Sequence, residues 1–432
     1  MAIPEHPLFH RRYLAWIVVV AAALVAGVGW LAFALLKPTP PRFVTMATGP
    51  EGSVTAELGK RYRELLARDG VDLRLSASPG AVANVARLRD PKSGVGLAII
   101  PSGITTRSDS PEIVSLGTLF YEPLWIFSRG RPLAERLRGS RSLRISVGAE
   151  GSAARAFSVE FLARLGIVDG RNAKLLGLAP EAAAEKLLSG EIDAAIVLDA
   201  WESPLVQRLL AARNIHLVNA PRADSWVALY PYLNKVVLPA GVADMARNVP
   251  PENVTLLAPK ANLAVRSDLH PAIQYLLLEA AAQTHSGPGV FHKAGDFPAA
   301  ESIDLPLSDQ ARQFYKTGPP FLQRHLPFWF AILIQQLLVL LIPVLGLLYP
   351  LLRFAPAAFG WAMRRKILNL YVELKLLEED VAARHLPSED LAARLQRLEE
   401  HVDQTWLPIS FRPLLYQLRM HISLVRERMK RA

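Results

Sequence analysis

The 432-residue sequence contains no cysteine. It can therefore form no disulfide, use no thiolate nucleophile and bind no zinc or iron–sulfur cluster through thiolates. Four further motifs are missing: a G-x-x-x-x-G-K-S/T phosphate loop, a G-x-G-x-x-G fingerprint, a G-x-S-x-G elbow and an H-E-x-x-H zinc motif. The ten histidines are scattered along the chain. We expect no metal and no cofactor, and we predict that the protein is not an enzyme.

Basic residues outnumber acidic ones, so the formal net charge is +10 at pH 7. A nucleic-acid partner is one explanation, but neither zinc-finger spacing nor an RNP-type aromatic motif is present, and we expect no such partner. Membrane topology is the other explanation. Two uncharged runs, 14–36 and 328–352, reach the roughly 20 apolar residues that a helix needs to cross a bilayer. The alternatives are a buried core helix for either run and a cleaved signal peptide for the first.

Basic residues also predict the orientation of these runs. Arg353, Arg364, Arg365 and Lys366 follow the second run, which favours a cytoplasmic location for both termini. The predicted order is a cytoplasmic N-terminus (1–13), a transmembrane helix (14–36), an extracytoplasmic solute-binding domain (37–327), a second transmembrane helix (328–352) and a cytoplasmic helical tail (353–432).

Between the two runs, short apolar stretches alternate with helical patterns, which is typical of a mainly parallel α/β sheet. Strands are predicted at 42–48, 71–77 and 95–100, and the pattern begins again at 143 and includes a further strand at Ala194–Leu198. A helix is predicted over Ser53–Asp69, with Leu58, Tyr62, Leu65 and Leu66 on one stripe. We therefore predict two α/β lobes, with the stretch Ser115–Gly130 crossing between them.

The sequence G-x-E-G-S occurs twice, at Gly49–Ser53 and at Gly148–Ser152, each time between a strand and a helix. Ligands of open α/β sheets bind at the carboxyl ends of strands, and a helix N-terminus favours an anion. A third turn, Ser78–Ala81, also opens a helix. The three turns would suit a carboxylate, bound by backbone N–H groups and by the hydroxyls of Ser53, Ser78 and Ser152. The alternative is an ordinary turn followed by a serine N-cap.

The two turns also carry an acid each, Glu51 and Glu150. The pair could act in acid–base chemistry. The alternative, which we prefer, is that acids before a helix N-terminus stabilise the helix dipole, since no nucleophile or metal partner accompanies them.

Several segments in order resemble one family: "TGPEGSVTAELGKRYRELL", "SPGAVANVARLRDP", "LFYEPLWIF", "ISVGAEGSAARA" and "VVLPAGVADMARNVPPENVTLLAPKANLAVRSDLHPA". They resemble the TAXI-type solute receptors of TRAP transporters, and "GPPFLQRHLPFWFA" resembles the membrane-anchored branch. The resemblance covers roughly residues 40 to 380.

The resemblance implies a two-lobed fold of the type II periplasmic-binding-protein class that closes on a small organic anion, such as a carboxylate, a dicarboxylate or an acidic amino acid. The matching cleft residues are Gly52, Ser53, Ser78, Gly80, Ala81, Asn84, Gly151 and Ser152. The sequence departs from the family pattern at Thr55 and Ala56, where aromatic residues are usual, at Ser53 and Ala153, where glycine is usual, and at Ala81, where serine is common.

The resemblance also implies the setting. The expected location is the bacterial inner membrane with the main domain in the periplasm, and the expected partners are the lipid bilayer and TRAP-type permease subunits. Helical stripes occur in the tail at 364–381, where the stripe includes Leu368 and Tyr371, and at 388–404. They predict either a small helical hairpin or coiled coil, or an amphipathic segment on the membrane surface. The tail therefore leaves a second hypothesis open, a membrane-bound sensor or scaffold that signals through it without transport.

Overall fold

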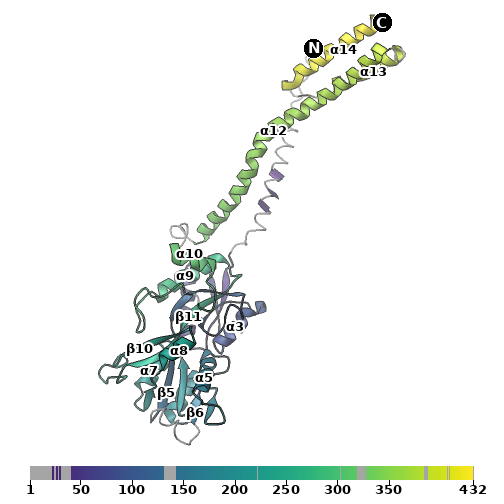
Figure 1. Ribbon diagram of the computed structural model, residues 1–432. Coiled ribbons are helices and arrows are strands. Elements are labelled where there is room, and N and C mark those ends of the chain that lie inside the picture. The colour runs from purple at the N-terminus through teal and green to yellow at the C-terminus, as the bar shows by residue number, and fades with distance from the viewer. Residues whose placement is uncertain are drawn as a thin grey trace. The chain divides into compact units, whose positions relative to one another are not determined.

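The computed structural model describes residues 40–130, 143–220, 222–301, 303–318, 326, 328–383, 388–405, 407 and 409–431, together with 22–23, 26–27 and 29–30. The chain divides into two compact units. One comprises Thr39–Leu333 and holds both β-sheets, and the other comprises Met1–Pro38 and Ile334–Ala432. Figure 1 shows the elements of both units.

The first sheet has six strands, and with the helices packed on it we call it the first lobe. Its strands are β1 (Phe43–Ala47), β2 (Asp72–Ser76), β3 (Val95–Pro101), β4 (Ile113–Tyr121), β10 (Leu233–Leu238) and β11 (Val254–Arg266). In this sheet, β1 pairs in parallel with β2 and β3. In contrast, β11 pairs antiparallel with β3, β4 and β10. The prediction of a mainly parallel sheet is therefore wrong in detail, because the antiparallel strand β11 makes the sheet mixed.

The second sheet has five strands and forms the second lobe with its helices. Its strands are β5 (Leu124–Arg129), β6 (Leu143–Ser146), β7 (Ala173–Leu176), β8 (Ala194–Leu198) and β9 (Ile215–Leu217). Here β6 pairs in parallel with β7 and β8, whereas β5 pairs antiparallel with β8 and β9. The predicted two-lobed α/β fold is confirmed, and each lobe repeats a parallel core with antiparallel neighbours.

Two adjacent segments connect the lobes. The chain leaves the first sheet at the end of β4 and enters the second sheet with β5, so the crossing predicted within Ser115–Gly130 is confirmed. It returns along β11, whose Leu256 packs in the core of the second lobe and whose Leu263 packs in the core of the first. The backbone N–H of Glu122 donates to the carbonyl of Pro259 at 3.0 Å and ties the two crossings together.

Helices cover both sheets. They are α2 (Val54–Arg68), α3 (Ala81–Arg89), α9 (Pro271–His285) and α10 (Asp309–Thr317) in the first lobe, α5 (Ala153–Arg164), α6 (Pro180–Ser189) and α7 (Pro204–Ala211) in the second, and α8 (Ala223–Leu229) beside β10. The stripe predicted on α2 is correct in part: Tyr62 and Leu66 are buried in the core, while Leu58 and Leu65 pack at its margin. Each buried large side chain removes apolar surface from water and contributes about 1.5–3 kcal/mol.

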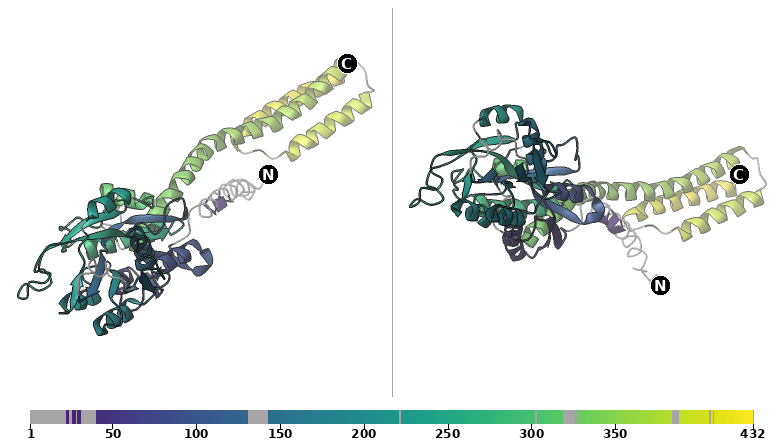
Figure 2. Two further views of the ribbon diagram at one scale, coloured as in Figure 1. Left: turned by 60° about the horizontal axis from the view of Figure 1, so that its bottom comes forward. Right: turned by 90° about the horizontal axis from the view of Figure 1, so that it is seen from below.

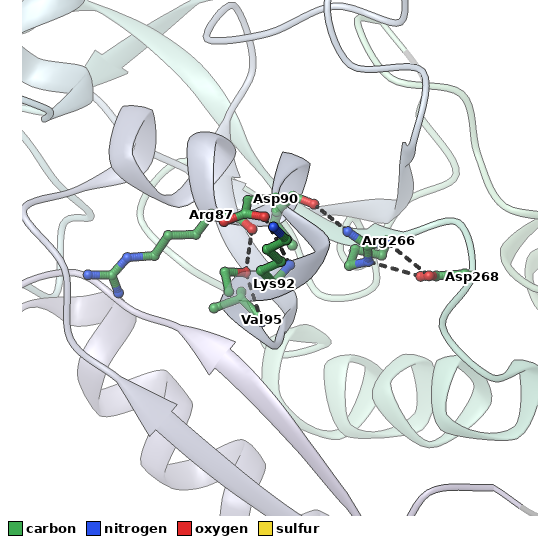
Figure 3. Close-up of polar contacts among 8 residues, drawn as sticks. Arg87, Asp90, Lys92, Val95, Arg266 and Asp268 are labelled. Carbon is green, nitrogen blue, oxygen red and sulfur yellow. Dashed lines mark hydrogen bonds and ion pairs between the residues drawn. The ribbon is translucent and has the colours of Figure 1, made fainter.

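A set of polar contacts ties the end of α3 to the first sheet (Figure 3). After α3, a 3-10 turn (Pro91–Ser93) begins where the carboxylate of Asp90 accepts from the N–H of Lys92 at 2.9 Å. From β11, Arg266 donates to the carbonyl of Leu88 at 3.1 Å and pairs with Asp268 at 2.9 Å. These bonds satisfy carbonyls at the helix end and hold α3 against the sheet.

The second unit is helical where it is described. Its helices are the C-terminal part of α12 (Phe328–Ala383), α13 (Ser388–Gln404) and α14 (Arg412–Arg431). A 3-10 turn (Ile409–Phe411) directly precedes α14. Both views of Figure 2 show α13 and α14 beside α12. Their shared core includes Leu374, Leu395 and Ile422, which agrees with the predicted helical hairpin. The predicted stripe residue Leu368 is exposed instead, because the buried stripe runs through Leu370.

The predicted first span, 14–36, lies largely outside the described residues, and the second, 328–352, falls within α12. Across the described ranges, no helix has both the length and the apolar character that a bilayer crossing requires.

Candidate functional site

A pocket lies between the two lobes, where the predicted turns face each other. It encloses about 840 Å³, including solvent at its mouth. The first lobe contributes the start of α2 and the start of α3, the second lobe contributes the start of α5, and Glu122 contributes from the crossing. Five of the eight predicted site residues line the pocket: Ser53, Gly80, Ala81, Asn84 and Ser152. The other three, Gly52, Ser78 and Gly151, belong to the same turns without lining it.

The two G-x-E-G-S turns share the conformation of their fourth residue but differ at the first, since Gly148 has a φ of 93° and Gly49 has no positive φ. Gly52 has a φ of 81° and Gly151 a φ of 80°, a left-handed conformation that glycine adopts without strain. Each turn then ends in a serine that caps a helix. Ser53 accepts from the N–H of Ala56 at 3.3 Å, and Ser152 accepts from the N–H of Arg155 at 3.2 Å.

The hydroxyl protons of the predicted serines are all used inside the protein. Ser53 donates to the carbonyl of Pro50 at 2.7 Å, and Ser152 donates to the carbonyl of Ala149 at 2.6 Å. Ser78 donates to the carbonyl of Thr48 at 2.7 Å. In this conformation the three hydroxyls hold the turns, and donors for an anion must come from the backbone.

Backbone donors remain at two of the three helix starts. Within the described residues, no acceptor takes up the N–H groups of Val54 and Thr55 in α2 or of Ala153 and Ala154 in α5. The first N–H groups of a helix have no internal acceptor and lie at the positive end of its dipole. Thr55, Ala153 and Ala154 line the pocket, so both helix starts present positive potential to it.

The third helix start is occupied by the opposite lobe. The N–H groups of Val82 and Ala83 in α3 donate to the carbonyl of Gly151 at 3.1 and 3.2 Å. The contact is close because residue 80 is glycine: with a φ of 148°, a Cβ there would lie 2.8 Å from the Cα of Ser152. The lobes therefore touch at this edge of the pocket, and α3 serves the contact between them.

Two acids that the sequence reasoning missed also line the pocket, Glu122 and Asp199. Glu122 is only 7% exposed, and burial, reinforced by the negative charge of Asp199, raises the pKa of its carboxyl to about 8. Burial raises the pKa of Asp199 to about 6, although Ser203 and the N–H of Ala200 hydrogen-bond its carboxylate. The backbone of Asp199 is held by Trp125, whose indole N–H donates to its carbonyl at 2.9 Å.

A signal for these acids was present in the sequence. Asp199 directly follows a buried strand, at the edge of the sheet where ligands bind, and Glu122 interrupts the apolar crossing segment "LFYEPLWIF". In contrast, Glu51 and Glu150 are exposed and do not line the pocket, so the structure gives no support to an acid–base pair there.

Two further polar side chains of the pocket wall lack a complete set of partners. Asn84 is 2% exposed and donates from Nδ2 to the carbonyl of Thr48 at 3.2 Å, but its Oδ1 accepts no hydrogen bond. The Ser146 hydroxyl is also buried and unpaired. Buried polar groups normally have partners in a native protein, so these atoms mark positions where a ligand could bind.

Comparison with known proteins identifies the family of the chain. A family model described as NMT1-like matches residues 46–317, which span both lobes. The chain belongs to the NMT1-like family. No curated protein sequence matches it. These comparisons do not show the TAXI branch, which stays a prediction.

Solved structures that resemble the chain include several from transport systems. The periplasmic aliphatic sulphonate-binding protein of Escherichia coli is 11% identical, covering 57% of this chain and 70% of that one with a TM-score of 0.36. A periplasmic substrate-binding protein of an ABC transporter from Coxiella burnetii is 15% identical, covering 59% and 100% with a TM-score of 0.33. A Xanthomonas citri protein bound to ATP is 14% identical, covering 63% and 94% with a TM-score of 0.38.

Proposed function

We propose that this member of the NMT1-like family is a solute receptor that captures a small organic anion between its lobes for TRAP-type transport. The supporting observation is the pocket itself, at which the free N–H groups of α2 and α5 converge from different lobes. A carboxylate placed there would accept from both helix starts and would gain from both helix dipoles.

The mechanism is closure of one lobe on the other. In the part of the chain that the structure describes, the backbone crosses between the lobes at two adjacent places, the β4–β5 crossing and the β10–β11 segment. Such a joint lets the lobes rotate while each stays rigid, which is the hinge motion of two-lobed receptors. The lobes also share a hydrophobic cluster that includes Val85 of the first lobe and Phe157 of the second. The contact from α3 to the carbonyl of Gly151 would form on closure and seal the edge of the pocket.

Anchoring of the receptor in the bacterial inner membrane, with both lobes in the periplasm, belongs to the same proposal. The uncharged runs 14–36 and 328–352 of the sequence favour membrane anchoring, although no described helix is long and apolar enough to cross a bilayer. Extraction of cell membranes with alkaline carbonate distinguishes an anchored receptor from a peripheral one. An anchored receptor stays in the pellet, and a peripheral receptor is released.

The function is tested by thermal unfolding of the purified full chain in the presence of a panel of carboxylates and amino acids. A solute at 100 times its dissociation constant stabilises the folded state by about 2.7 kcal/mol and raises the melting temperature by several degrees. No rise with any member of a broad panel would contradict the proposal.

One pair of variants tests whether the anion binds at the helix starts. Ala154→Glu puts a negative charge on the pocket wall at the start of α5, and it should reduce the affinity for a carboxylate by about tenfold or more. Ala156→Glu is the matched control, since Ala156 is exposed in the first turns of the same helix and does not line the pocket. Equal affinities of the two variants would contradict this placement.

A second candidate function, a sensor or scaffold, is favoured by the helical core of the second unit, in which Leu374, Leu395 and Ile422 pack together. Deleting 364–432 should leave uptake intact if the protein serves transport. The same deletion should abolish the cellular response to the solute if the tail carries a signal.

A further inference from the structure

The pocket offers a solute two kinds of group. One kind is donors, the backbone N–H groups at the starts of α2 and α5. The other is acceptors: the carboxyls of Glu122 and Asp199 and the unpaired Oδ1 of Asn84. Among the described residues, no hydrogen bond or ion pair takes up the carboxyl of Glu122, which is buried against the pocket.

No basic side chain balances the acids of the pocket wall. Within the described chain, none of the residues that line the pocket is lysine, arginine or histidine. On the returning strand, Lys260 lies over the ring of Tyr121 and pairs with Glu301 at 2.5 Å. An ionised carboxyl of this wall therefore has no cation among the lining residues, and positive charge on the solute would stabilise it.

We propose that the solute carries an amino group as well as a carboxylate, with the ammonium bound by Glu122 and Asp199 and the carboxylate by the starts of α2 and α5. The proposal rests on the function proposed above and narrows its substrate class to aminocarboxylates, such as α-amino acids. Asn84 Oδ1 is a further acceptor for the ammonium.

The same acids disfavour a dicarboxylate. A second carboxylate placed beside Glu122 and Asp199 would meet two groups of its own sign in a pocket of low dielectric constant. Such a solute could bind only with protons on the acids, each of which would then donate a hydrogen bond.

The pH dependence of the affinity therefore distinguishes a solute with an amino group from one without. The pKa of Glu122 is raised to about 8 and that of Asp199 to about 6, so at pH 7 the empty pair holds about one proton. The other charges that act on this pair are Glu181 and Glu202, which both raise the pKa of Asp199. An ammonium favours the ionised pair and should release the proton, so its affinity should rise from pH 6 to pH 8. A carboxylate without an amino group favours the protonated pair, and its affinity should fall over the same range.

The test is calorimetric titration of the full chain at pH 6, 7 and 8, in buffers first passed over a chelating resin so that no metal ion bridges the acids. The probes are the standard L-α-amino acids, each compared with the acid that lacks its amino group, such as propionate for alanine and glutarate for glutamate. At pH 8 the amino acid that binds should do so about tenfold or more tightly than its deaminated partner.

Substitutions identify the acids responsible. Glu122→Gln keeps the shape of the side chain but removes its charge, so it should weaken amino-acid binding about tenfold at pH 8. It should also remove the part of the rise in affinity that lies above about pH 7, where Asp199 is already ionised. It should not weaken binding of the deaminated acid. Glu150→Gln is the matched control, since Glu150 is exposed beside the pocket without lining it. Asp199→Asn gives a second, independent variant should Glu122→Gln fail to fold.

The outcomes separate this inference from the function on which it rests. If a deaminated acid binds the wild-type chain as tightly as the amino acid at pH 8, or if both substitutions leave binding unchanged, the inference is wrong and the receptor function stands. If neither kind of probe binds the wild-type chain, the receptor function fails, and the inference fails with it.

Discussion

The turn at Gly49–Ser53 in the first lobe and the turn at Gly148–Ser152 in the second both connect a strand to a helix. Both have a left-handed glycine at the fourth position and a serine that caps the helix. They differ in what their other groups bind. In the first turn, the hydroxyl of Thr55 accepts from the N–H of Gly49 at 3.0 Å and completes the turn within its own lobe. In the second turn, the equivalent residue is Ala154, and the carbonyl of Gly151 accepts from α3 of the opposite lobe.

The difference shows that a repeated motif need not have a repeated role. Local chemistry gives both turns the same bend into the helix, because glycine at the fourth position permits the bend and serine at the fifth satisfies the helix start. The position of each turn against the other lobe then decides that the second turn joins the lobes and the first does not. Three pairs of substitutions test this comparison.

Gly80→Ala should have the largest effect, because it disrupts the contact between α3 and the carbonyl of Gly151, which distinguishes the second turn. The added Cβ would lie 2.8 Å from the backbone of Ser152, and the φ of 148° disfavours any side chain. We expect the lobes to stay apart and the affinity for solute to fall about tenfold to a hundredfold, since closure would cost roughly 1–3 kcal/mol. Titration calorimetry measures the affinity, and small-angle scattering measures closure.

The control for that substitution is Gly52→Ala in the first turn. Gly52 also has a positive φ, but no atom lies within 4 Å of the position of its added Cβ. It should lower the free energy of unfolding by about 1 kcal/mol without a matching loss of closure. Equal closure in the Gly80 variant and the wild-type chain would remove the role given to the second turn.

Ser53→Ala and Ser152→Ala test what the two turns share. Each variant removes an N-cap, so each should lower the free energy of unfolding by about 1 kcal/mol in chemical denaturation. Affinity for solute should change by less than about threefold, because both hydroxyls donate to turn carbonyls. A large loss of affinity with unchanged stability would instead show that the hydroxyls bind the solute.

Thr55→Val tests the smaller difference inside the first turn. The variant keeps the shape of the side chain and leaves the N–H of Gly49 without its acceptor, so the free energy of unfolding should fall by about 0.5–1.5 kcal/mol. Ala154→Val, at the equivalent place in the second turn, removes no hydrogen bond and is the matched control. If both variants lose the same stability, the bond to Gly49 contributes nothing.

Much of the fold could be predicted because its signals are local. The strand predicted over Ala194–Leu198 has the same bounds in the structure, and the helix predicted over Ser53–Asp69 appears as Val54–Arg68 with Ser53 as its cap. The repeated G-x-E-G-S sequence located both turns of the pocket. These features depend on residues a few positions apart, for which spacing and residue type are enough.

The acids of the pocket could not be predicted in the same way. Glu122 lies in the crossing between lobes and Asp199 follows a strand of the second sheet, and nothing in their separate surroundings marks them as neighbours. Their shared burial raises both pKa values, and burial is a property of the folded pocket.

The sequence by itself therefore determined the two α/β lobes, the segment that crosses between them, and the turns that open α2, α3 and α5. Only the tertiary structure decided that β11 returns antiparallel through the first sheet, that α3 binds the opposite lobe, and that two acids face the free helix starts. The physical reason is range: strands, helices and caps follow from neighbours along the chain, whereas lobe contacts and the charge balance of a pocket depend on residues that only folding brings together.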